Sequence, residues 1–235
     1  MKNKKNVIIT GASGQVGSKL VNILKSEFNI IPIVRSLIQD DSNVNYFCCK
    51  DLADKNESIK TFNKIMHEYQ AIDCLINVAG GFDIGSPIEQ QDWDKMFKIN
   101  FSTMLNATSC VLSHMKSKKG GKIINFGSVA GFDGMGMAAP YSASKAAVHN
   151  LSKTVNLEVS SSISSHLLVL SIIDTKINRQ AMPDSDFSKW INIKSIAEKI
   201  SLIINNQATD EIIYFEWLFN IKNSLTPTIL TKHID

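Results

Sequence analysis

Tyr141 and Lys145 are the residues of this chain whose types and spacing most directly suggest chemistry. If this segment opens a helix, residues four apart lie on one face, so the lysine ammonium comes close to the tyrosine phenol. A free tyrosine titrates near ~10, and a nearby cation favours the phenolate and lowers that pKa. We therefore predict that Tyr141 works as an acid or base near neutral pH, tuned by Lys145. Such a pair also occurs in ordinary helices, so the interpretation depends on the surrounding sequence.

The surrounding sequence alternates between short apolar runs and stretches with helical periodicity. The apolar runs predict strands at residues 6–10, 30–34, 45–49, 72–78, 122–126, 167–172 and 212–215. The periodic stretches predict helices at 16–24, around 59–66, and at 93–115, 141–159 and 196–204. Strands that alternate with helices imply a parallel sheet covered on both faces. No linker or internal repeat divides the chain, so we expect one domain over residues 1–235, a doubly wound α/β fold with seven parallel strands.

A glycine-rich loop stands between the first predicted strand and the first predicted helix. Its glycines, Gly11, Gly14 and Gly17, allow a tight turn, close approach of the backbone to a pyrophosphate, and close packing of helix on strand. The phosphates then meet the positive end of the helix and its unpaired N–H groups. We therefore predict a Rossmann-type dinucleotide site whose pyrophosphate contacts come from Gly11, Ser13, Gly14, Gln15, Val16 and Gly17.

The end of the second predicted strand indicates which dinucleotide is bound. An acid at this point would bind the ribose 2′-hydroxyl of NAD, whereas an arginine suits the 2′-phosphate of NADP. The chain has Arg35 and Ser36 here, and no acid before Asp40. A guanidinium and a hydroxyl together suit a phosphate. We predict that NADP(H) is preferred and that NAD(H) is possible; the alternative is a solvent-facing arginine in a loop.

Composition and charge narrow the partners. The 235 residues are 44% hydrophobic and carry a net charge of +3 with interspersed signs, so no nucleic-acid surface is expected. No apolar run approaches the ~20 residues that span a bilayer, so no membrane association is expected. The four cysteines form no C-x-x-C motif and the five histidines are scattered, so we predict neither a metal site nor disulfides. Reduced thiols fit a cytoplasmic protein.

Further motifs follow the predicted strands in order, and together they resemble the short-chain dehydrogenase/reductase family. They are Asp51-Leu52, the run from Asn77 to Gly80, Asn100, Ser128, and Tyr141 with Lys145. The resemblance covers nearly the whole chain and implies an oxidoreductase that transfers hydride between a nicotinamide cofactor and a small molecule. It also implies that the helices at 93–115 and 141–159 pair between subunits in a homodimer or homotetramer.

The resemblance assigns a role to each motif residue. It implies that Tyr141 donates or accepts the proton, that Ser128 hydrogen-bonds the reacting group, and that Asn100 holds a water in the proton relay. It implies that Lys145 binds the nicotinamide ribose and lowers the tyrosine pKa, and that Asp51 contacts the adenine. The further cofactor contacts implied are Leu52, Asn77, Ala79, Gly80 and Thr175.

Finer features resemble the dihydropteridine reductases within that family. Gln15 stands where a glycine is usual, and Phe82 follows two glycines. His149 is the last residue of the run Ala146-Ala-Val-His. After the sixth predicted strand, the stretch from Asp174 to Trp190 stands where a Pro-Gly pair is usual. The implied reaction reduces quinonoid dihydropterin to the tetrahydro form. Arg35 and Ser128 depart from that subgroup, and Ser128 favours reduction of small ketones or 3-oxoacyl thioesters instead. A dinucleotide-sensing binding protein is the non-enzymatic alternative.

Two segments are expected to enclose a small-molecule substrate. Residues 175–192 follow the end of a strand, where ligands bind in open α/β sheets, and their polar composition suits a lid. Residues 131–140 would form the opposite wall. The expected substrate contacts are Phe82, Met135, Met137, Met182 and Trp190, with the two aromatic rings stacking on a flat ligand. The alternative is that both segments are simple surface loops, and His149 is expected to be packed or on the surface rather than catalytic.

Overall fold

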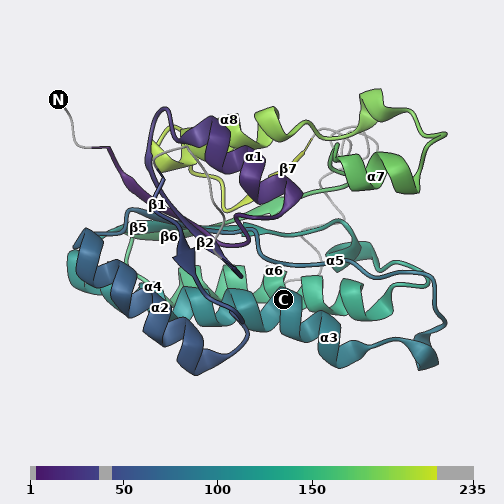
Figure 1. The fold of residues 1–235 in the computed structure, drawn as a ribbon, viewed down its shortest axis with the longest axis horizontal. Helices are drawn as coiled ribbons and strands as arrows, with labels where there is room; N and C mark the ends of the chain where they lie inside the picture. Colours follow the sequence, from purple (N-terminus) through teal and green to yellow (C-terminus); the bar gives the residue numbers. More distant parts are fainter. Residues whose placement is uncertain (1–3, 37–43, 216–235) are drawn as a thin grey trace.

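The computed structural model describes residues 4–36 and 44–215 and contains one seven-stranded sheet (Figure 1). Every pairing within the sheet is parallel, and the strand order is β3-β2-β1-β4-β5-β6-β7. The strands are β1 (Asn6–Ile9), β2 (Asn29–Val34), β3 (Phe47–Cys48), β4 (Cys74–Asn77), β5 (Gly121–Phe126), β6 (Ile163–Val169) and β7 (Ile212–Tyr214). The doubly wound α/β fold predicted from the sequence is confirmed. The order reverses between β1 and β4, and such a switch point is where these sheets bind ligands.

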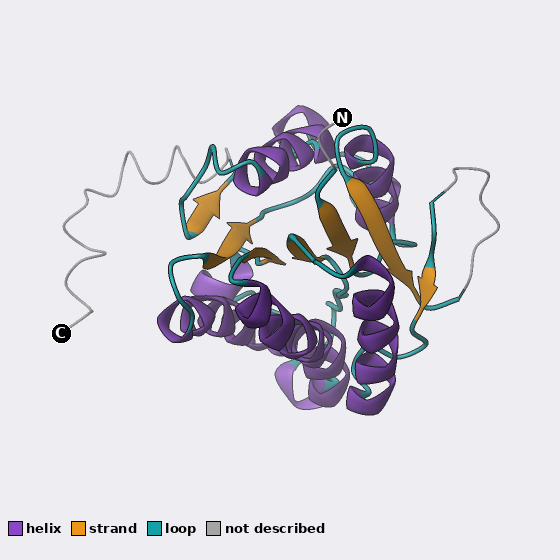
Figure 2. Cartoon of the chain, turned by 90° about the vertical axis from the view of Figure 1, so that its left-hand side faces the viewer, coloured by secondary structure: helices purple, strands orange, loops and turns teal. Residues whose placement is uncertain are grey.

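Helices cover both faces of the sheet (Figures 1 and 2). One face carries α1 (Gln15–Leu24) and α8 (Ile193–Ile204), and the other carries α2 (Lys55–Tyr69), α4 (Thr103–Lys118) and α6 (Ala139–Glu158). Three shorter helices lie near the carboxyl ends of the strands: α3 (Trp93–Phe97), α5 (Ala130–Asp133) and α7 (Lys176–Ala181). Short 3₁₀ turns occupy Ile88–Gln90 and Phe187–Lys189, and a π-helical turn occupies Lys98–Ser102. Among the described helices, none is long and apolar enough to cross a membrane.

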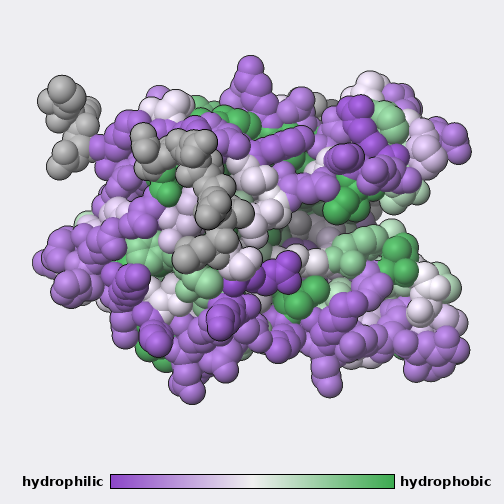
Figure 3. Space-filling view, in the orientation of Figure 1, coloured by the Kyte–Doolittle hydropathy of each residue, from purple (hydrophilic) through white to green (hydrophobic). Residues whose placement is uncertain are grey.

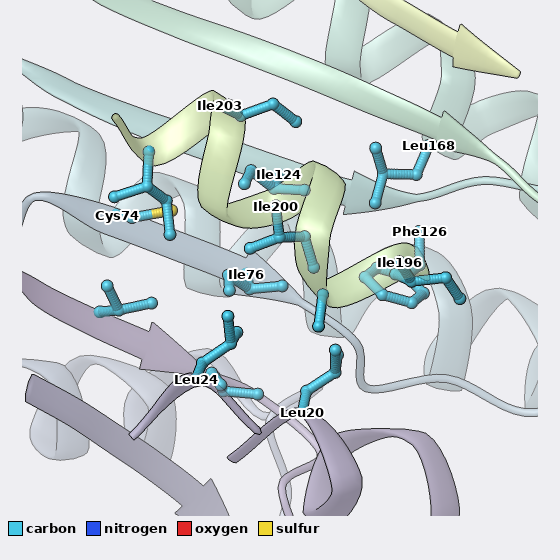
Figure 4. Packing of buried hydrophobic residues seen from close by; sticks show 14 of the residues in the cluster. Leu20, Leu24, Cys74, Ile76, Ile124, Phe126, Leu168, Ile196, Ile200 and Ile203 are labelled. Atoms are coloured by element: carbon cyan, nitrogen blue, oxygen red, sulfur yellow. The ribbon is translucent and has the colours of Figure 1, made fainter. Parts of the chain in front are cut away.

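The apolar spacing in the helices explains how they pack on the sheet. Ile196, Ile200 and Ile203 recur at helical spacing along α8, and all three side chains are fully buried. Figure 4 shows them facing Ile76 and Ile124 of the central strands. Burying one such side chain contributes roughly 1.5–3 kcal/mol, so this face holds α8 firmly on the sheet.

A buried polar network runs through the other side of the core. The Asn77 amide donates to Asn125 Oδ1 at 2.9 Å, and the Asn125 amide donates to Ser152 Oγ and Ser165 Oγ, both at 3.0 Å. These residues belong to β4, β5, α6 and β6. Each is at most 5% exposed, so the network joins three strands to α6 away from water. It thereby sets the position of the helix that carries Tyr141.

Two predicted elements differ from the structure. The sixth strand begins at Ile163 rather than residue 167 and ends at Val169, because polar residues in its first half are bonded inside the protein. His166 Nδ1 pairs with the Asp210 carbonyl at 2.7 Å, and Ser165 belongs to the network above. The predicted helix 93–115 is three pieces, because the π-helical turn interrupts it between α3 and α4. The remaining boundaries shift by a few residues.

Candidate active site

A cavity of about 700 Å³ opens at the carboxyl ends of β1, β2 and β4, next to the start of α1. It therefore lies at the switch point of the strand order. The structure brings most of the predicted cofactor residues to its wall: Gly11, Ser13, Gly14, Gln15, Val16, Gly17, Arg35, Asp51, Leu52, Ala79, Gly80 and Thr175. Residues this far apart in the chain meet here because parallel strands place their carboxyl ends at one edge of the sheet.

Three predicted cofactor residues lie elsewhere. Ser36 is exposed beyond the end of β2 and does not line the cavity. Asn77 lies in the core network, where it supports the sheet. Lys145 lies beyond the inner wall, close to Gly80: a methyl group built on that glycine would be 3.9 Å from Lys145 Nζ.

Val78, within the run from Asn77 to Gly80 that was expected to line the cofactor, is also on the wall. The wall residues that the sequence did not predict are Ile33, Val34, Cys49, Lys50, Lys98, Ile99, Thr103, Ile173, Ile177 and Asn178. Most lie beside predicted residues, at strand ends or at the start of the predicted lid. Their position at the end of a strand was the feature from which contact with the cofactor could have been predicted. For Lys98 and Ile99 the only such feature was that they directly precede Asn100, in a stretch with the pattern of a regular helix.

The backbone of the glycine loop fits an anion. Gly11 has a φ of +64°, and a methyl group on it would lie 2.8 Å from Ala79 Cα, so only glycine suits this turn. The loop then enters α1 at Gly14, whose position as the N-cap leaves the helix without a side-chain cap. The first turn of α1 contains no acidic residue. Uncapped N–H groups at a helix start attract phosphate, so the residues present fit a dinucleotide pyrophosphate.

The far end of the cavity is positively charged. Arg35, Lys50 and Lys98 line it, and Asp51 is the single carboxylate among the described lining residues. Lys98 Nζ lies 2.8 Å from Asp51 Oδ2, and this hydrogen-bonded ion pair lowers the pKa of Asp51. Because Lys98 balances Asp51, the charge that remains at this end is cationic. Such a wall suits an additional phosphate group.

Tyr141, Lys145 and Ser128 lie together just beyond the inner wall of the cavity, and none of the three lines it. Tyr141 and Lys145 lie one turn apart on α6, and the Lys145 Nζ is 5.9 Å from the centroid of the tyrosine ring. The same Nζ donates to the Phe126 carbonyl at 2.8 Å. Ser128 follows β5, is 7% exposed, and its hydroxyl hydrogen-bonds the Tyr141 phenol. The predicted acid–base pair and its serine are thus within one small volume.

The pKa of Tyr141 moves opposite to the direction predicted from the sequence. Burial raises it, and the hydrogen bond from Ser128 only partly offsets this effect. Lys145 does not lower it here, because the ammonium bonds the Phe126 carbonyl and lies over the ring rather than at the phenol oxygen. Burial also lowers the pKa of Lys145 to about 8. Tyr141 is therefore a protonated phenol at neutral pH, which suits a proton donor.

Asn100 is held in the π-helical turn between α3 and α4. Its Oδ1 accepts from the Gly81 N–H at 2.9 Å, and its Nδ2 donates to Ser144 Oγ at 3.1 Å. Ser144 in turn donates to the Tyr141 carbonyl at 2.8 Å. Single π turns inside helices frequently occur at functional sites. Here the turn places a 2% exposed amide between the loop after β4 and the start of α6.

A threonine joins the two strands that flank the switch point. Thr10 directly follows β1, and its hydroxyl accepts from the N–H groups of Val78 and Ala79, both at 3.1 Å. This contact holds the backbone after β4 against the end of β1. The inner wall of the cavity is therefore positioned by the same residue that begins the glycine loop.

Exposed apolar side chains lie near Tyr141, outside the wall of the cavity. The Phe82 ring meets the Tyr141 ring edge to face, with centroids 4.8 Å apart, and Phe82 remains 53% exposed. The loop that carries it bonds the opposite loop, because Gly85 N donates to the Met137 carbonyl at 3.0 Å. Met135 and Met137 are also exposed. In Figure 3 hydrophobic patches gather on the right, between the α7 region above and the α3 region below.

The predicted lid has a defined structure. It contains α7 and the 3₁₀ turn, and Ile177 N at the start of α7 donates to Gln15 Oε1 of the glycine loop at 3.2 Å. Trp190 packs on Phe187 with centroids 4.7 Å apart, and the Arg179 guanidinium lies 4.7 Å above the Phe187 ring. The structure places none of the expected substrate contacts on the wall of this cavity, neither Phe82, Met135 and Met137 nor Met182 and Trp190. Phe82 lies beside Tyr141, outside the cavity wall.

Comparisons with known proteins agree with this geometry. The family model for short chain dehydrogenases matches residues 5–186. A dihydropteridine reductase from Dictyostelium discoideum is 27% identical over 97% of this chain and 94% of its own length. A 3-oxoacyl-[acyl-carrier-protein] reductase from Buchnera aphidicola is 26% identical over 90% of this chain and 95% of its own.

Solved structures share the fold. ElxO with NADP bound superposes with a TM-score of 0.82 at 20% identity, over 93% of this chain and all of that one. A gluconate 5-dehydrogenase from Burkholderia cenocepacia, solved with NADP and tartrate, gives 0.81 at 19% identity over 93% and 96%. These likenesses show the fold, and the family-model match covers more than three quarters of the sequence. The chain belongs to the short-chain dehydrogenase family of oxidoreductases.

Proposed function

We propose that this protein is an NADPH-dependent reductase in which Tyr141 donates the proton. The observation that supports this most directly is the burial of Tyr141 beside Lys145 and Ser128, just beyond the inner wall of the cavity. When bound, the dinucleotide supplies hydride, and the protein supplies orientation and the proton. A binding protein that only sensed the dinucleotide would have no use for this arrangement.

The raised pKa of Tyr141 supports the reductive direction. A phenol that keeps its proton at neutral pH donates it to a substrate atom that gains electron density. Lys145, whose Nζ lies 5.9 Å from the centre of the Tyr141 ring, would bind the nicotinamide ribose when the cofactor is present. Asn100 links the loop after β4 to α6, and we propose that it also holds a water through which the proton is replaced.

The cofactor proposal rests on the cationic end of the cavity. Arg35 and Lys50 line it, and Lys98 compensates the charge of Asp51. This arrangement suits the 2′-phosphate of NADP, and among the described residues of the wall no unpaired carboxylate is offered to the ribose diol of NAD. ElxO and the gluconate 5-dehydrogenase, which share the fold, were solved with NADP. We expect NADH to be used less efficiently.

Quinonoid dihydropterin is the leading substrate proposal. The exposed Phe82 ring beside Tyr141 and the exposed Met135 and Met137 offer apolar contacts for a bicyclic ring. The dihydropteridine reductase relative covers both chains almost completely. Reduction of small ketones or 3-oxoacyl thioesters is the second candidate, because the Ser128 hydroxyl is placed to polarise a carbonyl oxygen.

The surroundings of the site extend the proposal. Residues 175–192 carry Thr175, Ile177 and Asn178 on the cavity wall, and we propose that this segment covers bound ligands. Leu105 on α4 and Leu157 on α6 are exposed apolar residues, 36% and 86% respectively. We propose that α4 and α6 pair between subunits, which sedimentation of the purified protein tests directly.

The first experiment measures NADPH and NADH oxidation by the purified protein with quinonoid dihydropterin regenerated in the cuvette. Turnover with NADPH supports the pterin proposal. NADPH binding without pterin turnover moves the substrate to the carbonyl class, and ketones and 3-oxoacyl thioesters are assayed next.

Tyr141→Phe tests the mechanism with whichever substrate turns over. General acid catalysis contributes about 10²–10⁴-fold, so kcat should fall by that factor while NADPH still binds. Tyr69→Phe is the matched control, because Tyr69 ends α2 and packs on Phe47 of β3. Unchanged turnover in Tyr141→Phe would refute the mechanism.

A further inference from the structure

His149 lies one turn beyond Lys145 on the same helix, and its ring faces the loop that carries Ser128. Its Nε2 accepts a hydrogen bond from the Ser128 backbone N–H at 3.1 Å, and the residue is only 3% exposed. Tyr141, Lys145 and His149 are spaced four residues apart, so one face of α6 presents all three.

The direction of the Ser128 N–H explains why an acceptor is needed. The amides on either side of it, those of Gly127 and Val129, donate to the Leu168 and Leu170 carbonyls on β6 and just after it, at 2.8 and 3.0 Å. Backbone groups alternate in direction along an extended segment, so the Ser128 N–H points away from β6 and toward α6. His149 accepts from it, and a buried N–H without a partner is costly.

The imidazole is confined on several sides. A methyl group on Gly127 would lie 2.7 Å from Nε2, and one on Gly131 would lie 2.5 Å from Cε1. The Phe132 ring lies 4.4 Å from the imidazole, centroid to centroid. The two glycines thus give the ring its space, and their backbones with Phe132 prevent it from turning away from Ser128.

The charge state agrees with the role of acceptor. Burial, Lys145 and Lys153 lower the pKa of His149 to about 4, so the ring is neutral at physiological pH. Because Nε2 accepts from Ser128, the ring proton is on Nδ1. A neutral ring in this form is a hydrogen-bond acceptor fixed on a helix rather than an acid or base.

The Ser128 hydroxyl is oriented as a consequence. Its oxygen accepts from the Ala130 N–H at 3.3 Å, and it hydrogen-bonds the Tyr141 phenol. We propose that His149 is a positioning residue: by binding the Ser128 N–H, it holds the serine hydroxyl against Tyr141 at the reacting end of the site. This inference rests on the proposed reductase function, in which Ser128 and Tyr141 act together.

The test compares two substitutions at this position with the Ser128→Ala variant. His149→Leu removes the acceptor at similar bulk, whereas His149→Gln offers a side-chain oxygen near the place of Nε2. We expect His149→Leu to lower kcat about tenfold, the effect of one lost hydrogen bond, with an NADPH KM within about threefold of wild type. His149→Gln should recover most of the lost rate. Equal loss in both variants would show that ring shape alone matters and would overturn the proposal.

A double mutant shows whether His149 acts through Ser128. In a Ser128→Ala background, His149→Leu should cause no further loss of kcat, because the hydroxyl that it positions is already absent. Losses that multiply would overturn the proposal. Melting temperatures and NADPH binding of every variant show whether it has folded, and if His149→Leu does not fold, His149→Asn, which loses the Nε2 position, replaces it.

Amide hydrogen exchange at Ser128 separates this inference from the proposed function. Protection of the Ser128 N–H should fall in His149→Leu and persist in His149→Gln, whether or not a substrate is known. If Tyr141→Phe keeps full turnover, the proposed mechanism is wrong. Amide exchange at Ser128 still shows in that case whether His149 binds the Ser128 N–H. If protection is unchanged in His149→Leu, His149 does not hold Ser128.

Discussion

Lys145→Met should change how the stability of this protein depends on pH. Burial lowers the pKa of Lys145 from 10.5 to about 8, so the unfolded chain binds this proton more strongly than the folded protein does. Stability rises with pH wherever the unfolded state binds more protons. The charged Lys145 therefore lowers the free energy of unfolding by its full amount below about pH 8. This destabilisation decreases between about pH 8 and 10.5 and vanishes above that range. Methionine has similar length and carries no proton, so the variant lacks this dependence.

The magnitude follows from the two pKa values. Holding the ammonium in the folded protein at pH 7 costs about 3 kcal/mol relative to the unfolded chain, and at pH 9.5 this falls to roughly 1 kcal/mol. The difference in unfolding free energy between Lys145→Met and wild type should therefore shrink by roughly 2 kcal/mol from pH 7 to pH 9.5. Changes in packing or in the bond to the Phe126 carbonyl cancel in this comparison, because they are common to both pH values.

The assay is urea unfolding of both proteins at the two pH values without cofactor. Lys153→Met is the matched control, because Lys153 is exposed on the same helix, and its difference from wild type should stay constant. A Lys145→Met difference that is equally constant would refute the reasoning. The expected result would mean that the site keeps a catalytically useful lysine at the expense of stability.

Three further predictions concern the cofactor end, the rate and a helix start. Arg35→Ala should lower kcat/KM for NADPH at least about tenfold, because one charge-assisted contact with the 2′-phosphate is lost. The kcat/KM for NADH should stay within about threefold of wild type. Equal losses with both cofactors would contradict the assignment of Arg35 to the 2′-phosphate. For reduction, kcat/KM should be level below about pH 8 and fall above it, as Lys145 loses its proton; a rate that rises there would contradict this. Asp54→Ala removes the cap that accepts from the Glu57 N–H at 2.8 Å and should cost about 1 kcal/mol, lowering Tm by about 2–4 °C in a melting curve. An unchanged Tm would show that the cap adds nothing.

Local patterns in the sequence were sufficient to predict the fold and many of the residues that line the cavity. The glycine loop was identifiable because turn, backbone approach and helix packing each demand glycine at a set position, as Gly11 shows with its φ of +64°. Tyr141 and Lys145 were identifiable because a helix brings residues four apart together. Both inferences need only neighbouring residues, so no long-range contact had to be known.

Features that depend on contacts between distant segments were not predictable. His149 contacts Ser128 only because α6 packs beside the loop after β5, and no residue spacing in the sequence predicts this contact. The raised pKa of Tyr141 depends on how deeply the phenol is buried. The start of the sixth strand was missed because Ser165 reads as a loop residue until its buried partners are known.

The row of polar residues at the ends of the central strands also bears on how the sheet assembles. The apolar residues of β1, β4 and β5 are nearly interchangeable, but they are followed by Thr10, Asn77 and Asn125 respectively, and the two asparagines are direct partners across their strands. A strand shifted along its neighbour would still match apolar with apolar, yet it would bury each amide without a partner, at about 1–3 kcal/mol apiece. Misaligned sheets are thus disfavoured as alternative folds, and the level strand ends that form the cavity are selected while the chain folds.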